Sequence, residues 1–390
     1  MFHHRSFIWL IALSFWVMSG VADSAATVTL AAKGDGLSVL KTPVSPVLSA
    51  NTAVFATGLD NPRGLAFGPD GYLYVAEGGS GGTQMTMAQQ CSQVPGPVGP
   101  YSGGYTSLIS KISPAGVRSI VADHLPSSQT TAVMGSLVSG VADVAFIGNT
   151  LYGLEAGAGC SHGLAGTDNT IFRVNSNGTT TTIANLSAFV KANPVAHPDS
   201  GDLEPDGTWY GVVAVRGAFY ATEPNHQELV RVGLDGNITR IVDMSVTFVA
   251  PDNWQGPTGI AYHGNFFIGM LGMFPVTPGT QGVYKFTPHG NMTQVANGLT
   301  TVMGVAFDRA GNLYAVESDT VAGFPGPSAA GTGRVVRVND DGTLTTIASG
   351  LVFPTAITYG PDGRLYVSNL GFGAPPLGLG QIVRITLPNP

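Results

Sequence analysis

A short pattern of apolar and polar positions recurs along the chain. It is clearest from Asn61 to Glu77, where an apolar run, a Pro-Asp-Gly turn and a second apolar run lead to a carboxylate, and it returns from Phe353 to Asn369. Alternation of apolar and polar residues with period two predicts strands, and the Gly and Asp of the turn allow a tight hairpin between them. Two copies at opposite ends of the chain indicate a repeat protein.

Six such units can be aligned on one residue of the first run. The aligned residues are Phe67, Phe146, Ala214, Tyr262, Phe307 and Tyr359. Each unit continues with a third run that has a basic residue between apolar ones, such as Val336-Arg337-Val338, and most add a Thr/Val/Ile-rich fourth run. Four antiparallel strands per unit are typical of a propeller blade. We therefore predict an all-β, six-bladed β-propeller that occupies residues 51–390 as a single domain.

The sixth unit lacks its fourth strand, and the start of the propeller supplies a match for it. Residues 53–59 (Ala53 to Leu59) closely resemble residues 345–351 (Thr345 to Leu351), the fourth strand of the fifth unit. We expect this N-terminal strand to complete the last blade. Such pairing closes the ring and removes an exposed sheet edge.

The residues before the propeller predict export. Basic residues at 3–5, an apolar run from Phe7 to Met18 and small residues up to Ala26 are typical of a secretory signal peptide over residues 1–26. The apolar run is too short to span a bilayer comfortably. We expect a flexible leader at residues 27–50 and a secreted or periplasmic monomer that has no transmembrane anchor once the signal is removed.

Composition narrows the classes of partner. The chain is 44% hydrophobic and only 11% charged, with 54 Gly and 26 Pro, which favours strands and turns over helices. Its formal net charge is -7. Because Lys and Arg form no cluster, we expect no nucleic-acid partner.

Loop lengths divide the predicted disc into a plain face and a loop-rich face. The long insertions fall between second and third strands, or between one blade and the next, and these connections emerge on the same side. Long loops on a rigid scaffold are where binding usually resides, so we expect a small molecule, a glycan or a protein to bind there. Cys91 and Cys160 lie in corresponding loops of the first two units. We predict a disulfide between them, with two free thiols as the alternative.

The residues that open the first strands lie nearest the axis and are candidates for ligand binding. These candidates, with one loop aromatic, are Arg63, Asp143, Tyr210, Trp254, Thr258 and Thr355. Arg63 is suited to anchor a carboxylate or another anion; the alternative is that it pairs with Asp143 of the next blade. Tyr101 and Phe274 are further loop aromatics that could line a groove. With Asp143 as its one acid, this inner ring is poorly equipped for metal-assisted hydrolysis.

Most of the second strands end in a residue whose side chain has an oxygen that could bind a cation. In blade order the residues are Glu77, Glu155, Glu223, Met270, Glu317 and Asn369. One hypothesis is a circle of ligands for Ca²⁺, the one cofactor that the sequence suggests; the other is that each acid caps its own blade by accepting hydrogen bonds from loop amides. The loop at residues 197–206 adds Asp199 and Asp202, near His162 and His226 on the same face.

The stretch from Pro62 to Glu77, with the Pro- and Gly-rich loop from Cys91 to Pro100, resembles the ScyD/ScyE family of exported propellers, named from the scytonemin pigment cluster of cyanobacteria. The resemblance covers nearly the whole chain after the leader and implies export and six blades. Ala221 to His226 resembles the NHL repeat, whose members mostly bind partners. These likenesses favour a non-catalytic binding scaffold.

A similarity to the senescence-marker/gluconolactonase group suggests an alternative function. That group has a similar Pro-x-Gly-Leu-Ala strand and takes its metal ligands from inner-strand Glu, Asn and Asp, where this chain has Arg63, Thr258 and Thr355. The alternative is a Ca²⁺-dependent lactonase that would use Glu77, Glu155, Asp143 and Glu223.

Overall fold

The computed structural model describes residues 47–201, 203–250, 253–323, 329–371 and 378–388. The predicted signal peptide and most of the predicted leader lie outside these residues and stay predictions. Within the described part, no helix is long and apolar enough to cross a bilayer.

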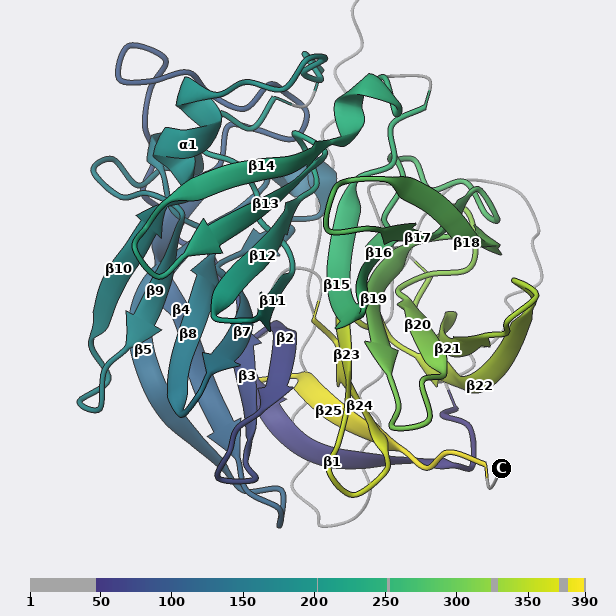
Figure 1. Ribbon diagram of the computed structural model, residues 1–390. Coiled ribbons are helices and arrows are strands. Elements are labelled where there is room, and N and C mark those ends of the chain that lie inside the picture. The colour runs from purple at the N-terminus through teal and green to yellow at the C-terminus, as the bar shows by residue number, and fades with distance from the viewer. Residues whose placement is uncertain (1–46, 202, 251–252, 324–328, 372–377, 389–390) are drawn as a thin grey trace, which may run out of the picture. The chain divides into compact units, whose positions relative to one another are not determined.

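Six antiparallel sheets form the fold, and they are the six predicted blades (Figure 1). Blade 1 contains β2 (Pro62–Phe67), β3 (Leu73–Glu77), β4 (Ser102–Ile112), β5 (Arg118–Gln129) and the added two-residue strand β6 (Val138–Ser139). Blade 2 contains β7 (Val141–Ile147), β8 (Thr150–Glu155), β9 (Thr170–Val174) and β10 (Thr180–Asn185). Blade 3 contains β11 (Val212–Val215), β12 (Ala218–Glu223), β13 (Glu228–Gly233) and β14 (Ile238–Asp243).

The second half of the chain repeats this order. Blade 4 contains β15 (Pro257–His263), β16 (Asn265–Met270), β17 (Gln281–Phe286) and β18 (Met292–Leu299). Blade 5 contains β19 (Val302–Phe307), β20 (Leu313–Glu317), β21 (Gly333–Val338) and β22 (Leu344–Leu351). Blade 6 contains β23 (Ala356–Tyr359), β24 (Leu365–Asn369), β25 (Gly380–Ile385) and β1 (Thr52–Leu59). The described helical segments are α1 (Leu186–Ala192), η1 (Ala132–Met134), η2 (Cys160–His162) and η3 (Met244–Val246).

The ring closes as the sequence predicted. The first strands of neighbouring blades contact one another in the order β2, β7, β11, β15, β19, β23 and back to β2. The N-terminal strand β1 pairs antiparallel with β25, so the first and last strands of the propeller belong to one blade (Figure 1). The end of the predicted leader also contacts the propeller, because the Ser49 amide donates to the Ser349 carbonyl at 3.1 Å. Blade 6 thus gains the fourth strand that the C-terminal repeat lacks, and the edge of β25 is covered.

The Pro-Asp-Gly turns recur because a Tyr on the following strand locks each Asp. The Tyr74 hydroxyl donates to Asp70 at 2.9 Å, and the Tyr366 hydroxyl donates to Asp362 at 2.9 Å. Gly71 follows Asp70 with a φ of 79°, a left-handed conformation that glycine adopts without a steric penalty. The repeated spacing of Asp, Gly and Tyr is therefore a requirement of the hairpin itself.

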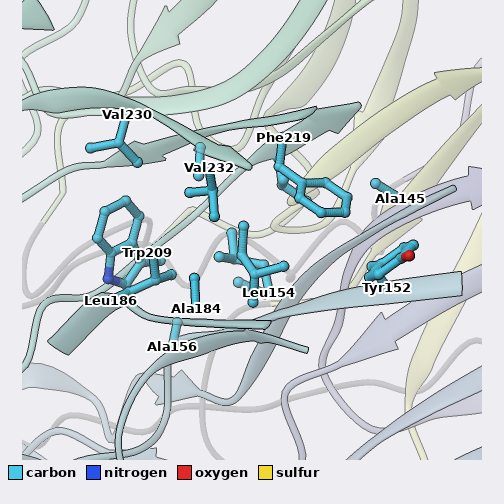
Figure 2. Close-up of a cluster of buried hydrophobic side chains, with 14 of the residues drawn as sticks. Ala145, Tyr152, Leu154, Ala156, Ala184, Leu186, Trp209, Phe219, Val230 and Val232 are labelled. Carbon is cyan, nitrogen blue, oxygen red and sulfur yellow. The ribbon is translucent and has the colours of Figure 1, made fainter. Parts of the chain in front are cut away.

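Packing between blades uses the aromatic residues of the repeat. Tyr74 of β3 meets Phe146 of β7 edge to face at 5.0 Å between ring centroids, and Tyr366 of β24 meets Phe67 of β2 in the same way at 5.1 Å. Figure 2 shows the core between blades 2 and 3, where Trp209 and Phe219 lie among aliphatic side chains. Such edge-to-face pairs add to the apolar burial that holds neighbouring blades together.

Candidate ligand-binding site

A cavity of about 380 Å³ opens on the loop-rich face, and its walls come from the long connections. The β3–β4 connection contributes Pro97, Val98 and Tyr101. The β5–β7 connection contributes Thr130, Met134, Leu137, Val138, Ser139 and Gly140. The connection from blade 2 to blade 3 contributes Asp199, Gly201, Glu204, Thr208 and Trp209. The connection from blade 3 to blade 4 contributes Trp254, and the β16–β17 connection contributes residues 271–274. Because these loops share one cavity, the two predicted classes of insertion do emerge on one face. We call this space the loop-face cavity.

The predicted disulfide is present and ties two of these loops together. Cys91, in the β3–β4 connection, is bonded to Cys160 at the start of η2, with an S–S distance of 2.06 Å. The Thr86 hydroxyl donates to the Cys160 carbonyl beside it. The disulfide therefore fastens the longest insertion of blade 1 to the segment of blade 2 that carries His162.

The floor of the cavity is made where the first strands begin. Arg63 is buried, and its Nη2 donates to the Val138 carbonyl of β6. The Tyr210 hydroxyl donates to the Thr355 carbonyl across the ring at 2.8 Å. Burial lowers the pKa of Arg63, and the adjacent Tyr210 hydroxyl partly offsets that shift. The guanidinium is thus held in a fixed place beneath the apolar walls.

One wall holds a buried polar network that joins three insertions. The Tyr101 hydroxyl donates to Oε1 of Glu204 at 2.6 Å, and Oε2 of Glu204 lies 3.5 Å from Nε2 of His162. The other ring nitrogen of His162 is 2.7 Å from the Ser128 hydroxyl. Tyr101 and His162 also meet edge to face at 4.7 Å between centroids. Tyr101 and Glu204 line the cavity, so this network presents a carboxylate to it.

A second carboxylate anchors the loop that carries Glu204. Asp206 accepts hydrogen bonds from the Ser161 amide at 2.8 Å and the Ser161 hydroxyl at 2.6 Å, and it forms an ion pair with Lys191 of α1. Burial alone would raise the pKa of Asp206, but the bonds from Lys191 and Ser161 outweigh it and lower that pKa. The loop of residues 203–209 is therefore fixed to both η2 and α1.

The predicted inner-ring residues separate into two groups. Arg63, Tyr210 and Trp254 all line the loop-face cavity. Thr258 and Thr355 bury their hydroxyls in bonds between blades, to the Val302 carbonyl at 2.5 Å and the Pro62 carbonyl at 2.6 Å. These two threonines lie outside the lining of the cavity and hold the ring together.

Asp143 faces the other end of the ring. It lines a separate cavity of about 460 Å³ between the first strands. Its two oxygens accept from the amides of Val144 and Val212, each at 2.8 Å, and burial raises its pKa to about 7. No ion pair joins Asp143 to Arg63 among the described residues. In place of the alternative pairing with Arg63, Asp143 accepts a hydrogen bond from the Val212 amide of blade 3.

The acids at the ends of the second strands cap their own blades. Glu77 accepts from the Asp60 amide at 2.7 Å, Glu317 from the Thr300 amide at 2.7 Å, and Asn369 from the Val352 amide at 2.7 Å. Each pair is 17 residues apart. Glu223 accepts from the Thr208 amide at 2.6 Å. In each of these blades the acid accepts a hydrogen bond from a backbone amide that would otherwise lack an acceptor. This agrees with the capping hypothesis.

The partners of these acids differ between blades. Glu77 pairs with Arg118 at 2.7 Å, and Glu317 pairs with Arg334 at 2.5 Å. Glu155 accepts from the amides of Ala156 and Gly157, and burial raises its pKa to about 8. Each acid is thus occupied within its own blade.

The acidic loop at residues 197–206 is described in part. Asp199 lines the loop-face cavity, and Asp202 lies outside the described residues. His226 lies at 3.3 Å from Glu223. Across the part of the chain that the structure describes, no three His, Cys, Asp or Glu side chains are grouped so that they could hold a metal ion.

The sequence pointed to Tyr101, to His162 and to the loop that contains Glu204, but it did not indicate Ser128 or the contacts among these residues. Tyr101, His162 and Glu204 come from three separate insertions, and Ser128 lies at the end of β5. The strands could be aligned because their sequence pattern recurs, but the insertions have no recurring pattern. Their spacing in the sequence therefore does not show which insertions lie in contact. The one available signal was that all these insertions belong to the loop-rich face.

Comparison with known proteins supports the architecture. No family model and no curated protein matches the chain. A protein of unknown function from Bacteroides thetaiotaomicron is similar in structure, with 13% identity, a TM-score of 0.52, and coverage of 87% of this chain and 76% of that one. A protein from Thermus thermophilus, provisionally described as an oxidoreductase (glucose dehydrogenase), has 15% identity, a TM-score of 0.51, and coverage of 86% and 99%.

A gluconolactonase from Xanthomonas campestris also aligns, with 11% identity, a TM-score of 0.49, and coverage of 86% of this chain and 89% of that one. At such low identity, the likeness is one of fold. The chain is therefore a six-bladed β-propeller closed by its own N-terminal strand.

Proposed function

We propose that this protein is an exported propeller of the ScyD/ScyE type whose loop-face cavity binds a small molecule. The observation that carries the proposal is the cavity itself, enclosed by insertions from several blades on one side of the ring. Ligand pockets in proteins are typically concave, mainly apolar and supplied with a few well-placed polar groups. The loop-face cavity has each of these properties.

The size and lining of the cavity favour a small molecule over a glycan chain or a protein surface. Its volume of about 380 Å³ falls in the range of small-molecule pockets. Tyr101, Trp254 and Phe274 supply aromatic surface, while Arg63 and Glu204 supply charge at separate points. A protein partner would require a broad and flatter surface.

The disulfide supports the predicted export. Disulfides persist mainly in oxidising compartments outside the cytosol. The Cys91–Cys160 bond joins two loops of the binding face, so that face gains rigidity in the compartment to which the signal peptide is expected to direct the chain.

The lactonase alternative is less well supported by the geometry. Glu77, Glu155 and Glu223 are engaged in capping bonds at the ends of separate blades. Asp143 lines the cavity between the first strands rather than the loop-face cavity. These four acids therefore do not share one site.

A fragment screen by ligand-observed NMR tests the proposal. The purified mature protein is compared with Leu137→Trp, which fills the cavity from its lining, and with Val133→Trp, an exposed position of the same connection. We expect a set of fragments to bind the wild type and Val133→Trp but to lose binding to Leu137→Trp. Fragments that bind all three proteins equally, or none at all, would contradict a ligand site in this cavity.

A further inference from the structure

Glu204 differs from every capping acid in one respect: one of its oxygens is buried without a hydrogen bond. The side chain is 1% exposed, and Oε1 accepts from the Tyr101 hydroxyl. Oε2 has no hydrogen-bond partner among the described residues. The nearest nitrogen, Nε2 of His162, is 3.5 Å away and likewise has no hydrogen bond within the described part of the chain. A buried carboxylate oxygen without a donor is costly, so this position is prepared for a donor from elsewhere.

The surroundings of Glu204 are those that favour a cation. Of the charged residues that line the cavity, Glu204 and Asp199 are carboxylates and Arg63 is the guanidinium. Arg63 directs its Nη2 to the Val138 carbonyl at the floor. The aromatic rings of Tyr101, Trp254 and Phe274 line the same space. Aromatic faces and a carboxylate together form the usual environment for an organic ammonium group.

We infer that Glu204 is the subsite for a protonated amino group, so that the ligand of the loop-face cavity is an organic amine with an apolar body. This inference rests on the proposed function, because it names the ligand class of that same cavity. The ammonium group would donate to Oε2 of Glu204, and the apolar body would lie against the aromatic walls. A charge-assisted bond of this kind is about twice as strong as a neutral one.

The geometry also assigns Tyr101 the role of a positioning residue. Its hydroxyl donates to Oε1 of Glu204, while Oε2 accepts no hydrogen bond from the described residues and lies 3.5 Å from Nε2 of His162. Asp199 is more exposed than Glu204, and its Oδ1 is engaged with the Gly201 amide at 2.9 Å. Glu204 is therefore the carboxylate that selects the ligand, and Asp199 adds negative potential at the mouth.

Three matched probes test the inference on the wild-type protein. They are 4-phenylbutylamine, 4-phenylbutanol and 4-phenylbutyrate, which share one apolar body and differ in charge. We expect the amine to bind at least about tenfold more tightly than the alcohol, since hydrogen bonds to charged groups contribute about 1.5–3 kcal/mol, and the carboxylate to bind most weakly. Affinities are measured by intrinsic tryptophan fluorescence and calorimetry at pH 7.

Variants locate the effect. Glu204→Gln should reduce amine affinity about tenfold or more and leave alcohol affinity nearly unchanged. Asp235→Asn, which removes one negative charge on an exposed turn, is the matched control and should change neither. Equal binding of amine and alcohol to the wild type, or tightest binding of the carboxylate, would overturn the amine subsite while the cavity remained a ligand site. If none of the probes and none of the screened fragments bound, the proposed function itself would fail.

Discussion

Two kinds of buried carboxylate occur on this propeller, and their difference separates architecture from function. Glu77 and Glu317 occupy the same position in two blades, and each accepts a backbone amide and pairs with an arginine. Glu204 occurs once, in an insertion, and keeps one oxygen without a hydrogen bond from the described residues at the wall of a cavity. The repeated acids have their bonds satisfied and stabilise the fold, whereas Glu204 is the acid that we propose binds a ligand.

This comparison gives a general way to interpret repeat proteins. A residue that returns in each repeat answers a need that each repeat has, here the cap on the connection from the preceding blade. Residues that bind a single ligand need not occur in every repeat. Polar groups from unrepeated insertions are therefore the better candidates for function, even when the repeated acids are more conspicuous in the sequence.

The largest expected effect is on stability, from removal of a capping acid. Glu77→Ala leaves Arg118 and the Asp60 amide without their partner. We expect the free energy of unfolding to fall by about 3–5 kcal/mol, because loss of one member of a buried pair leaves the other uncompensated. Urea unfolding measures it, and Glu317→Ala should give a similar loss. A loss below about 1 kcal/mol in both variants would contradict the claim that the repeated acids stabilise the fold.

Removal of the disulfide gives the next largest effect, and its local consequences should fall on the loop-rich face. Cys91→Ser releases the β3–β4 connection from η2, and with it the segments that carry Tyr101 and His162. We expect a loss of about 2–4 kcal/mol in the free energy of unfolding.

Hydrogen exchange locates this effect. Amide protection should decrease more at residues 84–101 and 160–164 than at the capped amides of Asp60 and Thr300, which lose only what the lower free energy of global unfolding removes. Uniform loss of protection in all six blades would show that the disulfide belongs to the architecture rather than to the binding face.

A smaller effect distinguishes the capping acids from one another. Glu155 is capped by amides alone, and its pKa is raised to about 8. The folded state then holds a proton that the unfolded state releases near pH 4.5, so the stability that this proton provides is present at acid pH and is lost as the pH rises toward 8. Glu155→Gln should therefore be on the order of 2 kcal/mol more stable than the wild type at pH 7, and about equal at pH 4.

Urea unfolding across this pH range provides the measurement. The difference between Glu155→Gln and the wild type should grow steadily as the pH rises. A constant difference between pH 4 and pH 8 would show that burial does not raise the pKa of Glu155 in the folded protein.

The fold could be predicted from the sequence because each of its requirements recurs. The Asp70–Tyr74 and Asp362–Tyr366 locks keep turn and strand in a fixed spacing, and the match of Ala53–Leu59 to a fourth strand revealed the closure. The added strand β6 was not predicted, since it consists of two residues within an insertion.

The site could be predicted only in outline. Arg63, Tyr210 and Trp254 line the cavity as candidates for binding, because position at the start of a first strand or in a long loop already places them on that face. Thr258 and Thr355 share the first of these positions but turn their hydroxyls to backbone carbonyls between blades. The direction of a side chain at the inner ring depends on such local hydrogen bonds. The repeat pattern in the sequence does not predict these bonds.

The most direct test of the account needs no ligand. The free energies of unfolding of Glu204→Gln and Glu77→Gln are measured in urea at pH 7 against the wild type. A group reserved for a ligand contributes little to the fold, so Glu204→Gln should be as stable as the wild type or more stable, whereas Glu77→Gln should lose about 2 kcal/mol or more. If Glu204→Gln lost as much stability as Glu77→Gln, Glu204 would be one more structural acid, and the distinction between repeated and single carboxylates would not hold.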